Sequence, residues 1–186
     1  MKTSDTDILI VPGWSNSGPD HWQSRWEAKL PTARRVEQED WYKPTRDGWA
    51  NRIVAAVRAA TKPVVIVAHS AGCSAVAHAA EHLKPHEVAG AFLVAPASER
   101  AKRAIPGMAE DFTAIPRKPL PFRSVLIASA TDPYCTPDEA RALAEAWGSD
   151  FVDAGDSGHL NTESGHGPWP DGLLRFAGFM KSLTAV

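Results

Sequence analysis

The apolar residues of this chain gather in short runs, separated by longer segments in which apolar positions recur every three or four residues. A short run without polar residues is typical of a strand that is buried on both faces, as in a parallel sheet. Such runs predict strands at 7–11, 64–67, 88–94 and 125–128, and shorter runs predict two more at 33–37 and 150–153.

Segments with helical spacing lie between these predicted strands. They predict helices at 19–30, 71–83 and 171–183, one after Thr45, and one from Pro137 to residue 147. Thr45 and Thr136 suit the N-cap position of a helix, and Pro137 suits the first helical position. The alternation of strands and helices predicts an α/β fold, with a central, mostly parallel sheet of about six strands and helices on both faces.

One segment, residues 95–122, interrupts this alternation with five prolines. It predicts an irregular excursion with a brief helix near 108–112, which is too short to form a second domain. A chain of 186 residues is long enough to bury one proper core. We therefore expect residues 1–186 to form a single domain.

The strand at 64–67 is followed at once by Ala68-His69-Ser70-Ala71-Gly72 and then by a helical pattern. A strand, a sharp turn around one serine and a helix form the nucleophile elbow, G-x-S-x-G. The turn is so tight that the residues two before and two after the serine must be small. Gly72 fits the pattern, whereas Ala68 replaces its first glycine with the next smallest residue. The alternative is that Ser70 is only the N-cap of an ordinary helix.

A serine hydroxyl is a poor nucleophile unless a base takes its proton and a third group orients that base. In the chain order of α/β-hydrolases, an acid and then a histidine follow the serine. The loop after the strand at 125–128 offers Asp132, and the loop after the last strand offers His159. Because the carboxyl ends of parallel strands meet at one edge, these residues predict a catalytic triad with Ser70.

Other acids and bases compete for these roles. Asp138 falls in the first turn of a predicted helix, where a carboxylate stabilises the helix without any catalysis. Asp153 and Asp156 come too late for the usual chain order, and His166 is the second candidate for the base. His69 is a neighbour of Ser70, but we expect its side chain to point away and pack beneath the turn.

Acyl transfer also needs two N–H groups that bind the oxyanion. We expect the N–H of Ala71, directly after the nucleophile, and the N–H of Trp14, in the loop after the first strand. Trp14, Trp22, His21 and Trp169 are predicted to border the substrate pocket. The alternative for these aromatic residues is that they only fill the core.

His78 and His82 match the pattern H-x-x-E-H, which occurs in zinc peptidases. They fall at the far end of the helix that leaves the elbow, away from the carboxyl ends of the strands. We therefore expect surface histidines and predict neither a metal nor another cofactor. Cys73 and Cys135 are too few for a disulfide framework, and free thiols indicate a reducing cytoplasm.

Composition narrows the range of partners. The net charge is −2, with 44% hydrophobic and 23% charged residues, and the sequence has no Lys/Arg cluster of the kind that binds nucleic acid or anionic membranes. No apolar stretch is long enough to span a bilayer, and the N-terminus lacks the pattern of a signal peptide. These features predict a cytoplasmic protein that binds neither nucleic acid nor membrane.

Longer motifs extend the pattern over nearly the whole chain: PGW, DHWQSRWE, VAHSAG, ASATDPYC, AEAWG and SGHLNTESGHGPWP. With these motifs the sequence resembles the small serine hydrolases grouped with retinoblastoma-binding protein nine, especially the bacterial members. The resemblance implies an α/β-hydrolase fold without a large lid, a triad of Ser70, Asp132 and His159, and oxyanion N–H groups on Trp14 and Ala71. The chain contains no L-x-C-x-E string, so a retinoblastoma-type pocket protein is not an expected partner.

The sequence thus predicts a serine hydrolase that cleaves small carboxylic esters through a covalent acyl-enzyme on Ser70. The alternative from another class is a binding or interaction protein that keeps the α/β-hydrolase fold with little or no catalysis, because fold alone does not establish chemistry.

Overall fold

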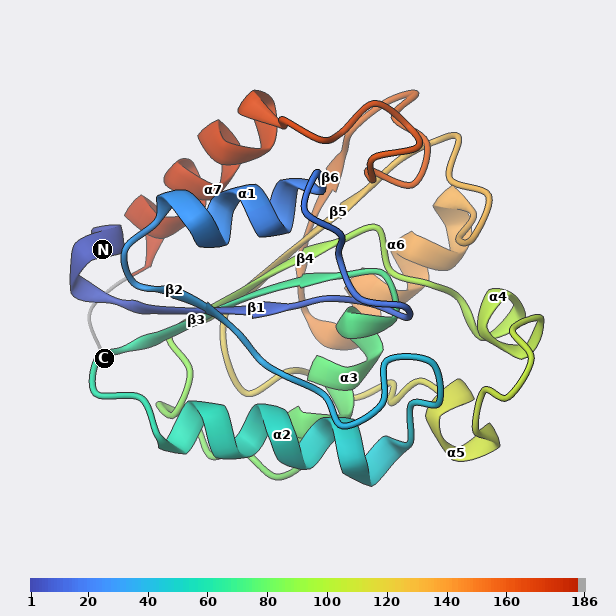
Figure 1. Ribbon diagram of the computed structural model, residues 1–186, viewed down its shortest axis with the longest axis horizontal. Coiled ribbons are helices and arrows are strands. Elements are labelled where there is room, and N and C mark those ends of the chain that lie inside the picture. The colour runs from blue at the N-terminus through green and yellow to red at the C-terminus, as the bar shows by residue number, and fades with distance from the viewer. Residues whose placement is uncertain (184–186) are drawn as a thin grey trace.

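A six-stranded sheet runs through the middle of the protein in the computed structural model, which describes residues 1–183 (Figure 1). Its strands follow the order β2-β1-β3-β4-β5-β6, and every neighbouring pair is parallel. The strands are β1 (Asp7–Val11), β2 (Ala33–Arg35), β3 (Val64–His69), β4 (Gly90–Val94), β5 (Ser124–Ala128) and β6 (Asp150–Asp153). The predicted parallel sheet is confirmed.

Helices cover both faces of this sheet, as Figure 1 shows. One face carries α1 (Trp22–Lys29) and α7 (Pro170–Ser182), and the other carries α2 (Arg46–Arg58), α3 (Ala71–Ala80) and α6 (Pro137–Trp147). A short 3-10 helix, η1 (Thr3–Asp5), precedes β1. The apolar residues of β1, β3, β4 and β5 point alternately into the two cores, because successive side chains of a strand face opposite sides.

The ends of some elements differ from the prediction for local reasons. Helix α1 begins at Trp22 rather than at residue 19, because His21 is its N-cap and accepts a hydrogen bond from the N–H of Gln23. Strand β3 continues to His69, which is in register with Val94 of β4. Thr45 and Thr136 cap α2 and α6 as predicted.

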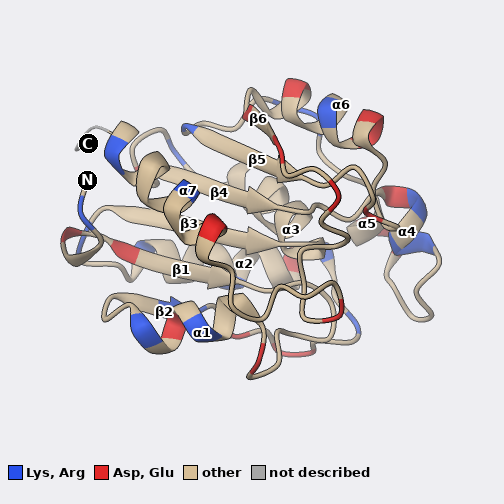
Figure 2. Ribbon diagram, turned by 90° about the horizontal axis from the view of Figure 1, so that it is seen from above, with Lys and Arg blue, Asp and Glu red and all other residues tan. Residues whose placement is uncertain are grey.

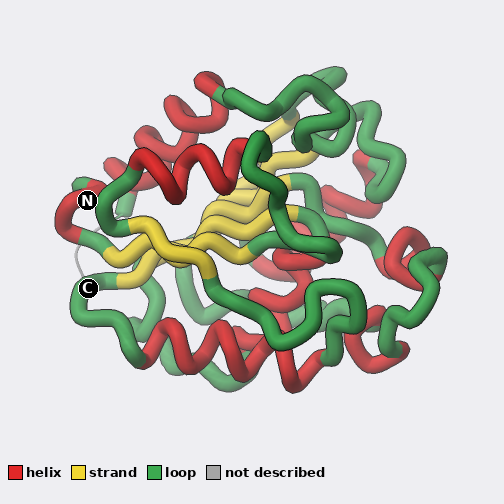
Figure 3. Tube along the Cα trace, in the orientation of Figure 1, coloured by secondary structure: helices red, strands yellow, loops and turns green. Residues whose placement is uncertain are grey.

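The carboxyl ends of the strands lie together at one edge of the sheet, where Figure 3 shows most of the long loops. The chain leaves β1 for α1 on one face, whereas it leaves β3 for α3 on the other. Such a divergence between two neighbouring parallel strands opens a crevice outside their carboxyl ends. The fold therefore places the residues that follow β1 and β3 on the two sides of one crevice.

The proline-rich excursion contains two short helices, α4 (Glu99–Arg103) and α5 (Glu110–Thr113), of which only the second was predicted. Ser98 caps α4 and its hydroxyl accepts a hydrogen bond from the N–H of Ala101. Both helices lie beyond the carboxyl ends of the strands, and they form no large lid (Figure 1).

Basic and acidic residues are mixed along α1, α4 and α6 (Figure 2). Among residues 1–183, no helix is both long enough and apolar enough to cross a membrane.

Lys102 of α4 is fully buried. Its hydrogen bonds connect the proline-rich excursion, residues 95–122, to α3. Its ammonium group donates to Ser74 Oγ of α3 at 3.0 Å and to the carbonyl oxygen of Phe112 at 2.8 Å. Burial lowers the pKa of Lys102 from 10.5 to about 7, although the nearby Glu99 carboxylate favours the charged form.

This lysine makes stability depend on pH. Between about pH 7 and the ordinary lysine pKa, the unfolded chain binds a proton at this residue that the folded chain does not, so the free energy of unfolding rises with pH. We expect the stability of the parent relative to Lys102→Met to rise by up to about 1.4 kcal/mol per pH unit across that window. Urea denaturation of the parent and of Lys102→Met at several pH values measures this difference in the free energy of unfolding. If the difference in stability between the two proteins did not change with pH, the lowered pKa of Lys102 would be contradicted.

Candidate active site

Ser70 lies in a sharp turn between β3 and α3. Its backbone has φ 56° and ψ −127°, a conformation that residues other than glycine rarely adopt. Such a conformation costs on the order of 1–3 kcal/mol and persists only where its surroundings enforce it. Here the N–H of Ser70 donates to the carbonyl oxygen of Val94, and the helix that follows is buried along its whole length.

Close contact between two backbones explains the small residue at position 72. A Cβ atom on Gly72 would lie 2.5 Å from the carbonyl oxygen of Val11 and 2.6 Å from that of Pro12. The first turn of α3 therefore packs directly on the chain leaving β1. Ala68 is fully buried within β3, where its methyl group fits.

The contact at Gly72 predicts a large cost for one added methyl group. We expect Gly72→Ala to destabilise the fold by about 1–3 kcal/mol, the usual cost of overpacking, because the atoms it meets belong to the backbone. Gly178→Ala is the matched control, since a Cβ there meets no atom within 4 Å and alanine in a helix is favoured by about 0.5–1 kcal/mol. Urea denaturation compares the two, and equal stability would contradict the argument.

Three side chains from three loops form one hydrogen-bonded chain. His159 Nε2 lies 2.9 Å from Ser70 Oγ, and His159 Nδ1 lies 2.8 Å and 3.0 Å from the two carboxylate oxygens of Asp132. A carboxylate only accepts hydrogen bonds, so Nδ1 of the imidazole carries the proton. In the neutral ring, Nε2 is then free to accept the hydroxyl proton of Ser70.

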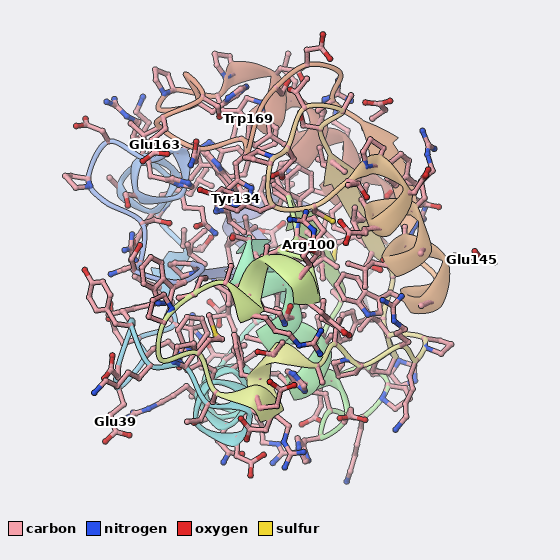
Figure 4. All side chains as sticks on the ribbon, turned by 90° about the vertical axis from the view of Figure 1, so that its right-hand side faces the viewer. Glu39, Arg100, Tyr134, Glu145, Glu163 and Trp169 are labelled. Atoms are coloured by element: carbon pink, nitrogen blue, oxygen red, sulfur yellow. The ribbon has the colours of Figure 1, made fainter. Side chains whose placement is uncertain are left out.

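Neighbouring groups fix the acid and the imidazole in place. Asp132 Oδ1 accepts a hydrogen bond from the N–H of Tyr134 at 2.9 Å, and the Tyr134 ring lies edge-on to the His159 ring at 4.6 Å. The side chains of Asp132 and His159 are only 2% and 8% exposed. Figure 4 looks onto the edge of the sheet where the carboxyl ends of the strands lie, with Tyr134 near the centre. Sequence reasoning missed Tyr134, whose one signal was its position two residues after Asp132.

Two backbone N–H groups next to Ser70 have no acceptor among residues 1–183. They belong to Ala71, the first residue of α3, and to Trp14, in the loop after β1. A Cβ on Gly13 would lie 2.8 Å from Ser70 Cβ and 3.2 Å from the nitrogen of Ala71, so this loop passes directly over the turn. The two N–H groups can receive negative charge that develops beside Ser70.

A cavity of about 300 Å³ opens at Ser70, and its walls differ in polarity. Part of its lining is apolar and comes from Ala97, Ala101 and Ile105 of the excursion. Other lining residues are polar and belong to the loops after β1 and β6: Asn16, Ser17, His21, Asn161 and Glu163. A larger hollow of about 420 Å³ lies at the opposite end of the sheet, around Lys62 and Glu87, far from the chain of hydrogen bonds.

Comparisons with known proteins identify the family of this chain. A family model described as serine hydrolase covers residues 8–178. This chain belongs to the serine hydrolase family. A YdeN-like hydrolase from Pectobacterium atrosepticum is 35% identical to this hydrolase, with a TM-score of 0.84 over 96% of this chain and 92% of that chain.

More distant structures share the fold of this serine hydrolase. The ydeN gene product of B. subtilis is 18% identical, with a TM-score of 0.79 over 96% of this chain and 100% of that chain. A thermophilic esterase from Thermogutta terrifontis is 16% identical, with a TM-score of 0.68 over 95% and 90% of the two chains. A comparison with curated proteins gives no match. The protein is a hydrolase with the α/β-hydrolase fold, and its predicted resemblance to small serine hydrolases is confirmed.

The structure corrects two of the four predicted pocket residues of this serine hydrolase. Trp14 and His21 line the cavity, whereas Trp22 and Trp169 do not. Trp22 is fully buried, donates from Nε1 to the carbonyl oxygen of Leu160 at 2.8 Å, and lies 5.1 Å from the Trp169 ring. Trp169 is 6% exposed and belongs to the same core, between α1, α7 and the sheet. Both tryptophans are therefore core residues.

The competing acids and the second candidate base have other partners in this hydrolase. Asp138 is in the first turn of α6, and Asp153 Oδ1 accepts from the N–H of Gly155. His166 Nδ1 lies 3.2 Å from Ser164 Oγ. The structure joins Ser70 to none of these three among its described residues.

His69 and His78 each form a hydrogen bond to a backbone carbonyl oxygen. His69, expected to point away from Ser70, donates from Nε2 to the carbonyl oxygen of His159 at 2.9 Å, and it is one of the residues that line the cavity. The contact with His159 was not predicted from the sequence. His78 is buried, with Nε2 3.0 Å from the carbonyl oxygen of Ala114. In the part of the chain that the structure describes, no three His, Cys, Asp or Glu side chains are grouped as a metal site would require.

Proposed function

We propose that this serine hydrolase cleaves small carboxylic esters through a covalent acyl-enzyme on Ser70. The observation that carries the proposal is the chain of hydrogen bonds from Ser70 through His159 to Asp132, beside two N–H groups that have no acceptor among the described residues. Nucleophile, base, orienting acid and oxyanion donors are the four parts that acyl transfer needs.

In the first half-reaction, Ser70 Oγ attacks the ester carbonyl carbon while its proton passes to His159 Nε2. The N–H groups of Ala71 and Trp14 bind the oxyanion, and the Asp132 carboxylate stabilises the imidazolium. The tetrahedral intermediate then collapses, because the C–O bond to the alcohol breaks and His159 gives its proton to the leaving oxygen. The products of this step are the free alcohol and an ester of Ser70.

In the second half-reaction, a water molecule gives a proton to His159 Nε2 and attacks the acyl carbon. The same two N–H groups bind the second oxyanion. When the bond to Ser70 Oγ breaks, His159 returns the proton to the serine and the carboxylic acid leaves. A cavity of about 300 Å³ with an alanine-rich wall suits short acyl or alcohol groups.

Labelling with a fluorophosphonate tests this proposal. Attack of an activated serine on the phosphorus expels fluoride and leaves a stable adduct that mass spectrometry detects. We expect one adduct on Ser70 in the parent, none in Ser70→Ala and much slower labelling in His159→Ala. A folded protein that forms no adduct, or forms it elsewhere, would contradict the proposal and favour a binding protein with the same fold.

We also propose that the enzyme is cytoplasmic, and the state of its cysteines supports this. Cys73 and Cys135 are both free thiols and both buried. Free, buried thiols are typical of proteins that remain in a reducing compartment.

A further inference from the structure

Two histidines outside the proposed triad lie side by side in the cavity at Ser70. The rings of His21 and His69 are 4.8 Å apart, and His69 is a further 4.8 Å from the ring of His159. His21 is 7% exposed and His69 5% exposed, yet both contribute to the wall of the cavity. Nothing in the proposed acyl transfer uses either imidazole as an acid or a base.

Hydrogen bonds to the protein fix which nitrogen of each ring carries the proton. His21 Nδ1 accepts from the N–H of Gln23 at 3.2 Å, so in the neutral ring the proton is on Nε2. His69 Nε2 lies 2.9 Å from the carbonyl oxygen of His159, which only accepts, so the proton is on Nε2 and Nδ1 is an acceptor. The two rings therefore offer opposite groups, a donor on His21 and an acceptor on His69.

Neither of these two nitrogens has a partner within residues 1–183, and neither is among the fully buried polar atoms that lack one. Each of the two atoms therefore keeps some accessible surface, and both residues line the cavity. Burial, together with the nearby His159 and Arg35, lowers the pKa of His21 to about 4. Burial also lowers the pKa of His69 well below its ordinary value. Both rings are neutral at neutral pH, so the tautomers assigned above apply.

We propose that His21 Nε2–H and His69 Nδ1 form a hydroxyl-binding subsite, so that the preferred esters carry a hydroxyl group near the scissile carbonyl. A hydroxyl both accepts and donates, and it satisfies both rings at once. A carboxylate or phosphate would face the lone pair of His69 Nδ1, and an ammonium would face the N–H of His21. The alkyl part of the substrate would contact the apolar lining residues Ala97, Ala101 and Ile105.

This subsite rests on the proposed function, because it orients an ester toward Ser70. The hydroxyl can come from the acyl part or from the alcohol part of the ester. Three esters of similar size distinguish these sources: ethyl butyrate as the reference, ethyl 3-hydroxybutyrate, and 2-hydroxyethyl butyrate. Acid release at constant pH gives kcat/KM for each.

For the parent enzyme we expect one hydroxylated ester to exceed ethyl butyrate in kcat/KM by about tenfold, since one neutral hydrogen bond contributes about threefold to tenfold. We expect the ratio to fall to about one in His21→Phe, which keeps a ring of similar size, and in His21→Ser, which keeps an N-cap for α1. Two variants keep the test valid if one of them fails to fold. His82→Phe, at an exposed position just after α3, is the matched control and should keep the ratio.

The ratio of two esters on one variant cancels any general change in the reactivity of Ser70. Equal kcat/KM for all three esters in the parent, or a ratio that survives both His21 variants, would overturn the subsite while leaving the proposed function intact. A larger gain for ethyl 3-aminobutyrate, which is cationic at neutral pH, would also overturn it. If instead no ester is hydrolysed and no fluorophosphonate adduct forms, the proposed function itself fails.

Discussion

Ser70→Ala lowers kcat for hydrolysis of p-nitrophenyl butyrate by on the order of 10⁶-fold, if the protein acts as proposed. The variant loses the atom that forms the acyl-enzyme, so His159 has no nucleophile to activate within hydrogen-bond distance. The oxyanion N–H groups and the cavity remain, and these alone support a residual acceleration of about 10³- to 10⁴-fold over water. Initial rates measured against the uncatalysed reaction give both values.

The comparison needs a serine variant that leaves the site alone. Ser149→Ala serves this purpose, because the Ser149 hydroxyl lies 2.6 Å from Ser124 Oγ where β5 and β6 begin, at the opposite end of the sheet. Its kcat should stay within about twofold of the parent, since surface and edge substitutions change little. If Ser70→Ala stayed within tenfold of the parent while folded by circular dichroism, Ser70 would not be the nucleophile.

The sequence predicted those parts of the site that depend on strand order. Val64–His69 is an apolar run followed by small residues, so both β3 and the sharp turn at Ser70 were visible in the pattern. Parallel strands carry their following loops to one edge, which is why Asp132 and His159 could be placed near Ser70 without a structure. These positions follow from topology and need no knowledge of side-chain packing.

Side-chain packing decides which residues reach the cavity and which are buried in the core, and the hydrophobic pattern of the sequence could not predict this. Trp14 and Trp22 both follow β1, but only the structure shows that α1 turns Trp22 into the core while Trp14 remains at the cavity. The same holds for His69, whose contact with the carbonyl oxygen of His159 joins residues 90 positions apart. Helix α4 was missed because its sequence, ERAKR, has no apolar stripe, and its buried Lys102 has the wrong chemistry for a core position.

Asp132→Asn replaces the carboxylate with an amide of the same shape. It tests whether Asp132 decides which nitrogen of His159 carries the proton. In the parent, Asp132 Oδ1 accepts from the N–H of Tyr134 while Oδ2 lies against His159 Nδ1. In the variant, the amide oxygen keeps the bond to Tyr134, so the NH₂ group takes the place of Oδ2 and donates to Nδ1. The imidazole then carries its proton on Nε2, facing Ser70, and cannot accept the hydroxyl proton. We expect kcat to fall by about 10⁴-fold with the fold intact.

Asp156→Asn makes the same chemical change at an exposed aspartate in the loop that carries His159, so it controls for charge. Its kcat should stay within about twofold of the parent. Steady-state rates on p-nitrophenyl butyrate, with urea denaturation to compare stability, measure both variants. The opposite result, an active Asp132→Asn and an inactive Asp156→Asn, would move the acid to the loop after β6. His159 would then have to turn its Nδ1 away from Asp132, although that contact, at 2.8 Å, is among the shortest of the site. The 2.8 Å contact and the Tyr134 N–H together support the proposed role of Asp132 as the acid that orients the base.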